Sequence, residues 1–456
     1  MDLVVNHTSD QHEWFRSSRR RERPYEDYYI WRDGVDGGPS NNWESFFGGS
    51  AWSYDEGRGQ YYLHLFAEEQ SDLNWEHPDV RADIYEMMSW WLGKGIDGFR
   101  MDVINLLSKR PRLPDGDSDG HDIVGGEHFV DGPRLHEFLD EVVERTFGDR
   151  RLEVVNVGEV TYVTPETALD VTGRRSDAID MTVFFDHMGI DREGRWLDAE
   201  WDLDDVRDVF AKWQRAADAG AWPCLYLENH DQPRSVLRFG DPAFRCESAT
   251  MLAAFLHSHR GTPFVYQGQE FGMTNASFDA PSDLRDIEAR NYWRKLEAAG
   301  HEFDDVEEWF RHSRDNARTP VTWTDGPDAG FTDGDPWLDP IEEYRTVNAA
   351  TDRASGRSIL AFYAELIELR GDDVLAYGDF ELVASDHEEI YAVHRSLESA
   401  DHDLLVACNF FDGEPTLRTA PDHGSAEPVL GNYESLPETP EGAEFRPYEA
   451  VVHRLR

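Results

Sequence analysis

The segment Gly98-Phe99-Arg100-Met101-Asp102 decides the fold, because a short apolar run ends there on a carboxylate. Val157-Gly158-Glu159 and Glu228-Asn229-His230-Asp231 repeat this arrangement further along the chain. Brief apolar runs are typical of parallel strands that are buried on both faces. A carboxylate at the carboxyl end of such a strand is where a (β/α)8 barrel keeps its catalytic residues. Three carboxylates that converge on one pocket predict acid–base and nucleophilic chemistry on a glycosidic bond.

Apolar spacing between these segments predicts helices that alternate with the strand-like runs. The predicted helices cover residues 79–95, 133–147, 203–217 and 246–259. Each has apolar residues on one side and is followed by a strand-like run. The alternation is the signature of a parallel sheet with crossover helices, so we predict an α/β fold for most of the chain.

Two parts of the chain depart from this alternation. Residues 8–75 are rich in Trp, Tyr, Gly and Asn but have no helical period. A long irregular segment inside a compact domain is usually functional. Residues 373–456 contain short strands separated by turn residues and acidic loops, a pattern typical of a small antiparallel β-sandwich.

The charge of the chain is strongly acidic and excludes several kinds of partner. The 456 residues include 92 Asp and Glu against 44 Lys and Arg, which gives a net charge of −48. Phosphate backbones and anionic bilayers need a basic surface, so we expect neither a nucleic acid nor a membrane as partner. Only four of the basic residues are lysines. Because such a surface needs salt to screen its self-repulsion, we predict a cytoplasmic protein of an extreme halophile.

The cysteines give no sign of a disulfide framework or a zinc site. There are three of them, Cys224, Cys246 and Cys408, and they lack motif spacing. We predict that they are small buried hydrophobic side chains. No apolar run approaches the length of a membrane span.

Several segments taken together resemble one known family. They are Asp2–His7, Gln70–Trp75, Gly98–Asn105, Val157–Val160, Asn229–Arg234 and Arg314–Pro320. This set is similar to the α-amylase-type retaining glycoside hydrolases, and most similar to their oligo-1,6-glucosidase and α-glucosidase branch. Each segment alone is moderately specific, whereas the combination extends over nearly the whole chain and is highly specific.

The resemblance implies a TIM-type (β/α)8 barrel with two additional domains. The barrel would comprise residues 1–7 and 76–372, and a loop-rich domain of residues 8–75 would be inserted after the third strand. Residues 373–456 would form the C-terminal antiparallel β-sandwich. The family's barrel begins upstream of the position that corresponds to Met1, so the first two β/α units are expected to be missing. An incomplete barrel has two open strand edges, and the activity of the chain as given is therefore left open.

The family assigns roles to the three carboxylates. Asp102 matches the nucleophile, Glu159 the general acid/base, and Asp231 a third carboxylate that holds sugar hydroxyls. Arg100 matches the arginine that keeps the nucleophile ionised, because residues two apart on a strand share a face and a nearby guanidinium lowers a carboxyl pKa. The acid/base must be protonated, which predicts a less charged environment around Glu159. Any one such residue at a strand end could instead be a cap or part of a structural ion pair.

Six further residues match positions that line the family's sugar pocket. They are His7, Phe47, Phe66, Gln70, His230 and Arg318. The two histidines would bind hydroxyls of the glucose that is cleaved off, and Arg318 would close the pocket by pairing with an acid from the missing segment. The alternatives are that Arg318 forms a structural ion pair and that the two phenylalanines are core aromatics.

No metal or cofactor is expected. Lys109 matches a position at which a lysine ammonium takes the place of a calcium ion in related amylases. A calcium site that some members have in the first barrel loop would lie in the missing segment. The aspartates within residues 115–122 lack the closing glutamate of an EF-hand, and we predict a solvated loop there.

Val103 directly follows the nucleophile and bears on the linkage. In the resembling branch, Val at this position goes with α-1,6 bonds and Thr with α-1,4 bonds, although such a swap biases specificity only modestly. The resemblance thus implies a retaining, exo-acting α-glucosidase that cleaves small oligosaccharides or disaccharides through a covalent glucosyl-enzyme.

Three alternatives stay open beside this interpretation. A sucrose or trehalose isomerase would use the same intermediate but transfer the glucosyl group to sugar. A non-catalytic scaffold of the same fold is disfavoured, because the chain keeps all three carboxylates and shows no membrane helix. An inactive remnant is supported only by the missing first units. The oligomeric state is not predicted.

Overall fold

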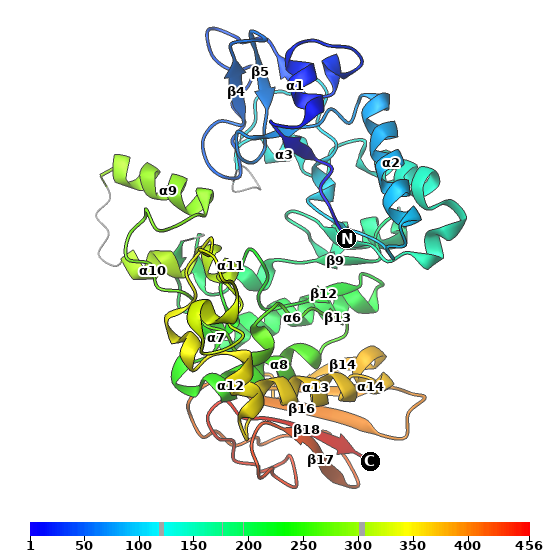
Figure 1. Ribbon diagram of the computed structural model, residues 1–456. Coiled ribbons are helices and arrows are strands. Elements are labelled where there is room, and N and C mark those ends of the chain that lie inside the picture. The colour runs from blue at the N-terminus through cyan, green and yellow to red at the C-terminus, as the bar shows by residue number, and fades with distance from the viewer. Residues whose placement is uncertain (118–122, 176, 195, 301–305) are drawn as a thin grey trace. The chain divides into compact units, whose positions relative to one another are not determined.

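The computed structural model describes residues 1–117, 123–175, 177–194, 196–300 and 306–456 (Figure 1). The chain packs into two units. The first contains Met1–Phe184, Gly220–Trp222 and Asn291–Gly300, and the second contains Phe185–Ala219, Pro223–Arg290 and His301–Arg456. The domain boundaries proposed at residues 75 and 372 stay predictions. Most of the aspartate-rich stretch 115–122 lies outside the described residues.

Four short parallel strands form the central sheet of the first unit. Their order is β1 (Asp2–Leu3), β7 (Arg100–Met101), β8 (Val157–Glu159) and β9 (Met181–Val183). Met101 pairs with Leu3 on one side and with Gly158 on the other. Because the strands are parallel and in register, Asp102 and Glu159 arrive at the same edge of this sheet.

Strand β7 begins at Arg100, whereas the apolar run that precedes it predicts an earlier start. Gly98 lies directly against the segment before β8, so that a Cβ on Gly98 would lie 1.9 Å from the Val155 carbonyl oxygen. Its φ of +150° also favours glycine. The Val157 amide nevertheless donates to the Phe99 carbonyl, so the two chains run together before the strands begin.

The helices predicted from apolar spacing are present, with ends shifted by a few residues. They are α2 (Pro78–Gly93), α4 (Leu135–Val142), α6 (Leu203–Asp218) and α8 (Arg245–His257). The α4 helix continues as a π-helical turn over Val143–Phe147. Asp202 is the N-cap of α6, and its side chain accepts hydrogen bonds from the Asp204 and Asp205 amides.

The remaining α-helices are distributed along the chain. They are α1 (Glu13–Arg19), α3 (Gly126–Phe129), α5 (Pro165–Leu169), α7 (Ser235–Phe239), α9 (Ile287–Ala298), α10 (Val306–Arg311), α11 (Asp315–Arg318), α12 (Ala349–Ala354), α13 (Ile359–Leu369) and α14 (Asp373–Tyr377). Within the described ranges, none of the helices combines the length and the apolar character that crossing a bilayer requires.

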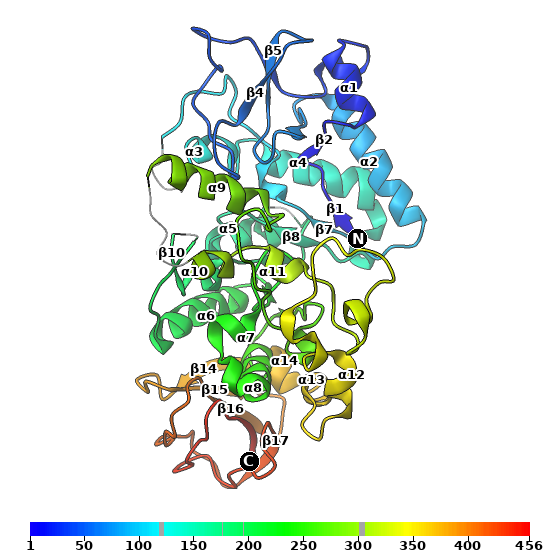
Figure 2. The ribbon, with the colours of Figure 1, turned by 60° about the vertical axis from the view of Figure 1, so that its left-hand side comes forward.

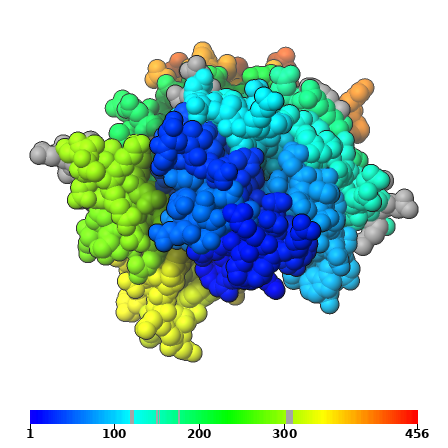
Figure 3. Space-filling view, turned by 90° about the horizontal axis from the view of Figure 1, so that it is seen from above, coloured from blue at the N-terminus to red at the C-terminus, as the bar shows by residue number. Residues whose placement is uncertain are grey.

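The segment of residues 8–75 is more regular than its sequence predicts. Strand β2 (His7–Ser9) pairs with β6 (Gln70–Asp72), and β5 (Gln60–Leu63) lies between β3 (Trp31–Arg32) and β4 (Trp52–Asp55). Its aromatic side chains supply the core, which includes buried Phe15, Tyr28, Tyr29, Trp31, Trp43 and Trp52. In the space-filling view, the blue residues of this segment form a continuous surface (Figure 3). The β2–β6 pairing brings His7 and Gln70 together.

The second unit is built around the buried helix α8. All residues from Ser248 to His257 are buried, as expected for a helix that is apolar on all sides. The helix packs against α13 and against the C-terminal strands (Figure 2). The parallel pair β12 (Pro223–Leu225) and β13 (Thr262–Pro263) and the hairpin β10 (Arg192–Glu193) and β11 (Leu197–Asp198) also belong to this unit.

One five-stranded antiparallel sheet ends the chain. Its strands are β14 (Asp379–Val383), β15 (Ile390–Ser396), β16 (Asp403–Asn409), β18 (Ala450–Leu455) and β17 (Ala426–Gly431), in this order. All residues from 379 to 456 are described, and they contain no second sheet that faces the first. The predicted sandwich is corrected to a single sheet. Helix α8 packs on strands β16 and β18, where a second sheet was expected. Loop residues such as Leu417 and Phe445 form a buried apolar cluster with side chains of the strands.

Candidate active site

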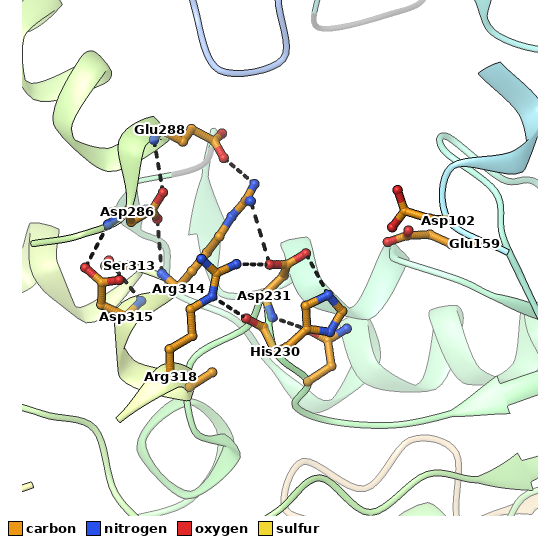
Figure 4. A network of polar contacts seen from close by, with 12 residues as sticks. Asp102, Glu159, His230, Asp231, Asp286, Glu288, Ser313, Arg314, Asp315 and Arg318 are labelled. Carbon is orange, nitrogen blue, oxygen red and sulfur yellow. Dashed lines mark hydrogen bonds and ion pairs between the residues drawn. The ribbon is translucent and has the colours of Figure 1, made fainter. Parts of the chain in front are cut away.

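Asp102 and Glu159 are neighbours, and one guanidinium holds both. Arg100 Nη1 donates to Asp102 Oδ1, and Arg100 Nη2 donates to Glu159 Oε2 over 2.5 Å. Figure 4 shows the two carboxylates side by side. The Asp102 and Glu159 side chains are 21% and 14% exposed, so both are largely buried yet reachable by a ligand.

Three carboxylates share the charge of Arg100, because Asp2 Oδ1 also lies 3.2 Å from its Nη1. Burial alone lowers the pKa of the Arg100 guanidinium, but Glu159, Asp102 and Asp2 outweigh burial and leave that pKa raised. The less charged environment predicted for Glu159 is therefore wrong, because the Arg100 guanidinium contacts its carboxylate directly.

Val103, the residue after Asp102, has an unusual backbone. Its φ of 37° and ψ of 44° are left-handed, which is rare for a β-branched residue. Its amide lies 3.4 Å from Glu159 Oε2, and its side chain belongs to a buried cluster with Trp43 and Phe129. Backbone strain of this kind concentrates at functional sites. Val103 therefore lies between the carboxylate pair and the core of the first unit.

Four of the predicted pocket residues lie together in the first unit. Gln70 Nε2 lies 3.1 Å from His7 Nε2. The centroid of the Phe66 ring lies 5.2 Å from that of His7 and 5.6 Å from that of Phe47. Burial lowers the pKa of His7, although the charges of Asp72 and Asp102 oppose that change. A neutral imidazole beside an amide and aromatic rings is suited to the hydroxyls and apolar faces of a sugar.

Lys109 lies in a buried site lined by oxygen atoms. Its Nζ is 2.7 Å from Asp72 Oδ2 and 2.9 Å from Asn6 Oδ1, and Asn6 Nδ2 donates to the same carboxylate. An ammonium among oxygen ligands is the arrangement that the resemblance implies for Lys109. Within the part of the chain that the structure describes, no group of three or more His, Cys, Asp or Glu side chains could hold a metal ion.

Asp231 lies in the second unit, in the loop that follows β12. Glu228 and Arg234 form a buried ion pair of 3.0 Å within this loop, and their side chains are 1% and 0% exposed. The amide and hydroxyl of Ser235 donate to the second oxygen of Glu228. A buried pair of this kind fixes geometry when its remaining atoms are hydrogen-bonded. It closes the loop that presents His230 and Asp231.

Positive charge surrounds Asp231. Arg318 Nη2 lies 2.6 Å from Asp231 Oδ1, Arg314 Nη1 lies 3.7 Å from the same oxygen, and His230 Nε2 lies 3.4 Å from Oδ2 (Figure 4). Burial alone raises the pKa of the Asp231 carboxyl, but Arg314, His230 and Arg318 outweigh burial and lower that pKa. Arg318 thus pairs with Asp231, the structural ion pair that was left open as an alternative.

Arg314 and Glu288 also belong to this group of charges, although neither was predicted as a site residue. Arg314 Nη2 lies 2.5 Å from Glu288 Oε2, and the Arg314 amide donates to Asp286. Arg314 precedes the short helix α11 and Arg318 ends it, a spacing that places both on one side of a helical turn. That spacing is the signal that could have revealed Arg314. Glu288 lies 26 residues away in sequence and has no such local signal.

The family follows from a comparison with known proteins. Residues 1–378 match the model of the family described as "Alpha amylase, catalytic domain". The match covers most of the chain, so the chain belongs to the α-amylase family of glycoside hydrolases. The barrel fold class of this family is thereby confirmed, together with the C-terminal antiparallel strands.

Individual relatives define the branch. The oligo-1,6-glucosidase of Parageobacillus thermoglucosidasius is 45% identical over 470 residues, which cover 100% of this chain and 83% of that protein. The crystal structure of the trehalose-6-phosphate hydrolase of Bacillus licheniformis is 41% identical with a TM-score of 0.91, over 100% of this chain and 83% of that one. The trehalulose synthase of Pseudomonas mesoacidophila MX-45 is 36% identical with a TM-score of 0.91, over 100% and 84%. The predicted oligo-1,6-glucosidase and α-glucosidase branch is confirmed, and the protein is an enzyme.

Proposed function

We propose that the protein is a retaining, exo-acting α-glucosidase that hydrolyses short α-glucosides. The observation that carries this proposal is the Arg100 bridge between Asp102 and Glu159. Retaining glycosidases place their two carboxyls about 5–5.5 Å apart, whereas inverting enzymes need about 6.5–9.5 Å for a water molecule. A single guanidinium that contacts both carboxylates supports the shorter spacing.

The proposed reaction has two steps. Asp102 attacks the anomeric carbon while Glu159 protonates the leaving oxygen, so that the glycosidic bond breaks as the bond to Asp102 forms. Glu159, now ionised, takes a proton from water, and the water oxygen displaces Asp102 to release glucose. Arg100 would stabilise the Asp102 carboxylate as it leaves in the second step.

The other predicted site residues are assigned to the sugar. The ionised Asp231, with His230, would hold hydroxyls of the glucose and favour its cationic transition state. Arg318 would orient Asp231 and close the pocket. In the first unit, His7 and Gln70 would bind further hydroxyls. The rings of Phe47 and Phe66, which contact each other, would line the pocket.

The proposed preference is for α-1,6 bonds, with α-1,4 bonds as weaker substrates. Val103 after the nucleophile supports this preference through the family resemblance, and the relative at 45% identity is named as an oligo-1,6-glucosidase. One side chain changes such a ratio only modestly.

A sucrose or trehalose isomerase is the second candidate. The likeness to a trehalulose synthase, at a TM-score of 0.91, favours it. The same glucosyl-enzyme would then be intercepted by a sugar hydroxyl instead of water.

We also propose the salt concentration and the compartment in which the protein works. The net charge of −48 supports a protein of the cytoplasm of an extreme halophile, because molar salt would screen the self-repulsion of its surface. Unfolding of the chain on transfer from molar KCl to dilute buffer would support this part, and full stability in dilute buffer would contradict it.

The test uses the chain in molar KCl with isomaltose, maltose and sucrose. We expect glucose to be released fastest from isomaltose and to appear first as the α-anomer by NMR. Initial release of β-glucose would contradict retention. Transfer products such as trehalulose from sucrose would favour the isomerase. Glu159→Gln serves as a control for contaminating activity.

A further inference from the structure

The turn after β8 carries none of the side chains assigned above, yet it governs the position of Glu159. Tyr162 has a left-handed backbone with φ of 54°, and the Val163 amide donates to the Val160 carbonyl. The chain therefore turns sharply directly after Glu159. A catalytic side chain is only as well placed as the backbone that carries it, so the contacts that hold this turn matter.

Asn105 holds the turn by two hydrogen bonds to one residue. Its Nδ2 donates to the Thr161 carbonyl over 2.9 Å, and its Oδ1 accepts the Thr161 amide over 2.9 Å. Asn105 is 0% exposed, so water does not compete for these contacts. Two bonds of opposite direction fix both the distance and the orientation of the Thr161 backbone.

Asn105 is itself anchored from a third segment. Its Nδ2 also donates to Asp131 Oδ1 over 3.0 Å, and the Asp131 amide donates to the Asn105 carbonyl. Asn105 follows Asp102 by three residues, in a 3-10 turn over Ile104–Leu106. One rigid side chain thus connects the loop that bears Asp102 to the turn behind Glu159.

We propose that Asn105 is a positioning residue that keeps the Glu159 carboxyl aligned for protonation of the leaving oxygen. The inference rests on the proposed α-glucosidase reaction. Arg100 contacts the two carboxylates themselves, whereas Asn105 fixes the backbone that carries the acid. Loss of Asn105 should therefore weaken acid catalysis more than it weakens nucleophilic attack.

The test compares two glucosyl donors whose leaving groups differ in their need for a proton. Fluoride departs from α-glucosyl fluoride with little acid catalysis, whereas the sugar oxygen of isomaltose must be protonated. Both donors form the same glucosyl-enzyme, so kcat/KM reports on the first step alone. Asn105→Ala should lower kcat/KM for isomaltose by about 10²-fold, the size expected for a misplaced catalytic group. For α-glucosyl fluoride the loss should be several-fold only.

Asn156 provides the matched control. It is also 0% exposed and clamps backbone, since its Oδ1 accepts the Phe99 amide and its Nδ2 donates to the Ala178 carbonyl. It lies before β8 instead of behind it. Asn156→Ala should leave the ratio of the two kcat/KM values unchanged, and this ratio does not depend on the fraction of folded enzyme.

A conservative variant keeps the test decisive if the alanine variant does not fold. Asn105→Asp retains the size of the side chain and an acceptor for the Thr161 amide, and it should give an intermediate ratio. An unchanged ratio in the Asn105 variants, or an equal change in Asn156→Ala, would overturn the inference and leave the proposed function standing. A wild-type chain that cleaves neither donor would overturn the proposed function, and the inference with it.

Discussion

The two groups of carboxylates differ in their balance of charge. In the first unit, Asp102 and Glu159 share one guanidinium with Asp2, whereas in the second unit Asp231 alone is approached by two arginines and a histidine. Burial does not explain the difference, because the Asp102 and Asp231 side chains are 21% and 27% exposed. The cations around Asp231 lower the pKa of its carboxyl, whereas the three carboxylates of the first group compete for one guanidinium.

The largest loss of activity is expected when a carboxylate is removed from the first group. Asp102→Asn keeps the shape of the side chain but removes the proposed nucleophile and one of the carboxylates that pair with Arg100. We expect kcat/KM for isomaltose to fall by about 10⁴-fold or more. Steady-state kinetics in molar KCl would measure this loss. A reduction of less than tenfold would contradict the assignment of Asp102 as nucleophile.

Buried histidines make the stability of the second unit depend on pH. In the second unit, burial lowers the pKa of His187 and His259 to about 3 and that of His257 to about 4. Between pH 6.5 and pH 4 the unfolded chain binds protons that the folded chain does not, so stability falls as the pH falls. Each histidine contributes up to about 1.4 kcal/mol per pH unit to the free energy of unfolding.

Denaturant unfolding at pH 7, 6 and 5 in constant KCl would measure this slope. His259→Phe removes one of the three groups, so its stability should depend less steeply on pH even if it is lower at pH 7. Equal slopes for the variant and the wild type would show that His259 has the same pKa in the folded and the unfolded chain.

The charge balance of the second group can be altered at Arg314. Arg314→Gln removes one of the charges that lower the pKa of Asp231, so this pKa should rise. The acidic limb of the kcat/KM profile should then move to higher pH by about one unit, with Arg318 and His230 still in place. Arg314→Lys keeps the charge and should move the limb less. An unmoved limb in Arg314→Gln would mean that Asp231 does not control it.

The smallest effect is expected from a substitution at Val103, which lies beside the first group of carboxylates. Val103→Thr keeps a β-branched side chain and therefore the same backbone strain, but it adds a hydroxyl beside the carboxylate pair. We expect a few-fold shift of the kcat/KM ratio from isomaltose toward maltose. No change in this ratio would show that Val103, which packs mainly in the core, does not determine the preference for one linkage.

The sequence predicted what depends on local pattern. Apolar runs that end on carboxylates located the ends of β7 and β8, and the apolar spacing located α2, α6 and α8. The start of β7 was missed, because the close approach of Gly98 to Val155 is a contact between distant segments. The single C-terminal sheet was missed for a similar reason, since α8 takes the place of a second sheet.

The residues of the candidate site also divide into those that a local sequence pattern reveals and those that it does not. The carboxylates follow strand-like runs and are visible in the sequence, as is the Arg100–Asp102 spacing along one strand. The Arg314–Glu288 pair and the Asn105–Thr161 clamp join residues that are 26 and 56 positions apart. Such partners are defined by the packed chain, and no period or motif within a segment announces them.

Lys109 shows how amino-acid composition can record a size constraint. The chain contains only four lysines among its 44 basic residues, yet one of them is buried between Asp72 and Asn6. A compact ammonium with three donors fits between these oxygens, whereas a planar guanidinium is larger and directs its donors differently. In a chain that otherwise uses arginine, the lysine at this buried position marks a place where the shape of the cation can matter more than its charge.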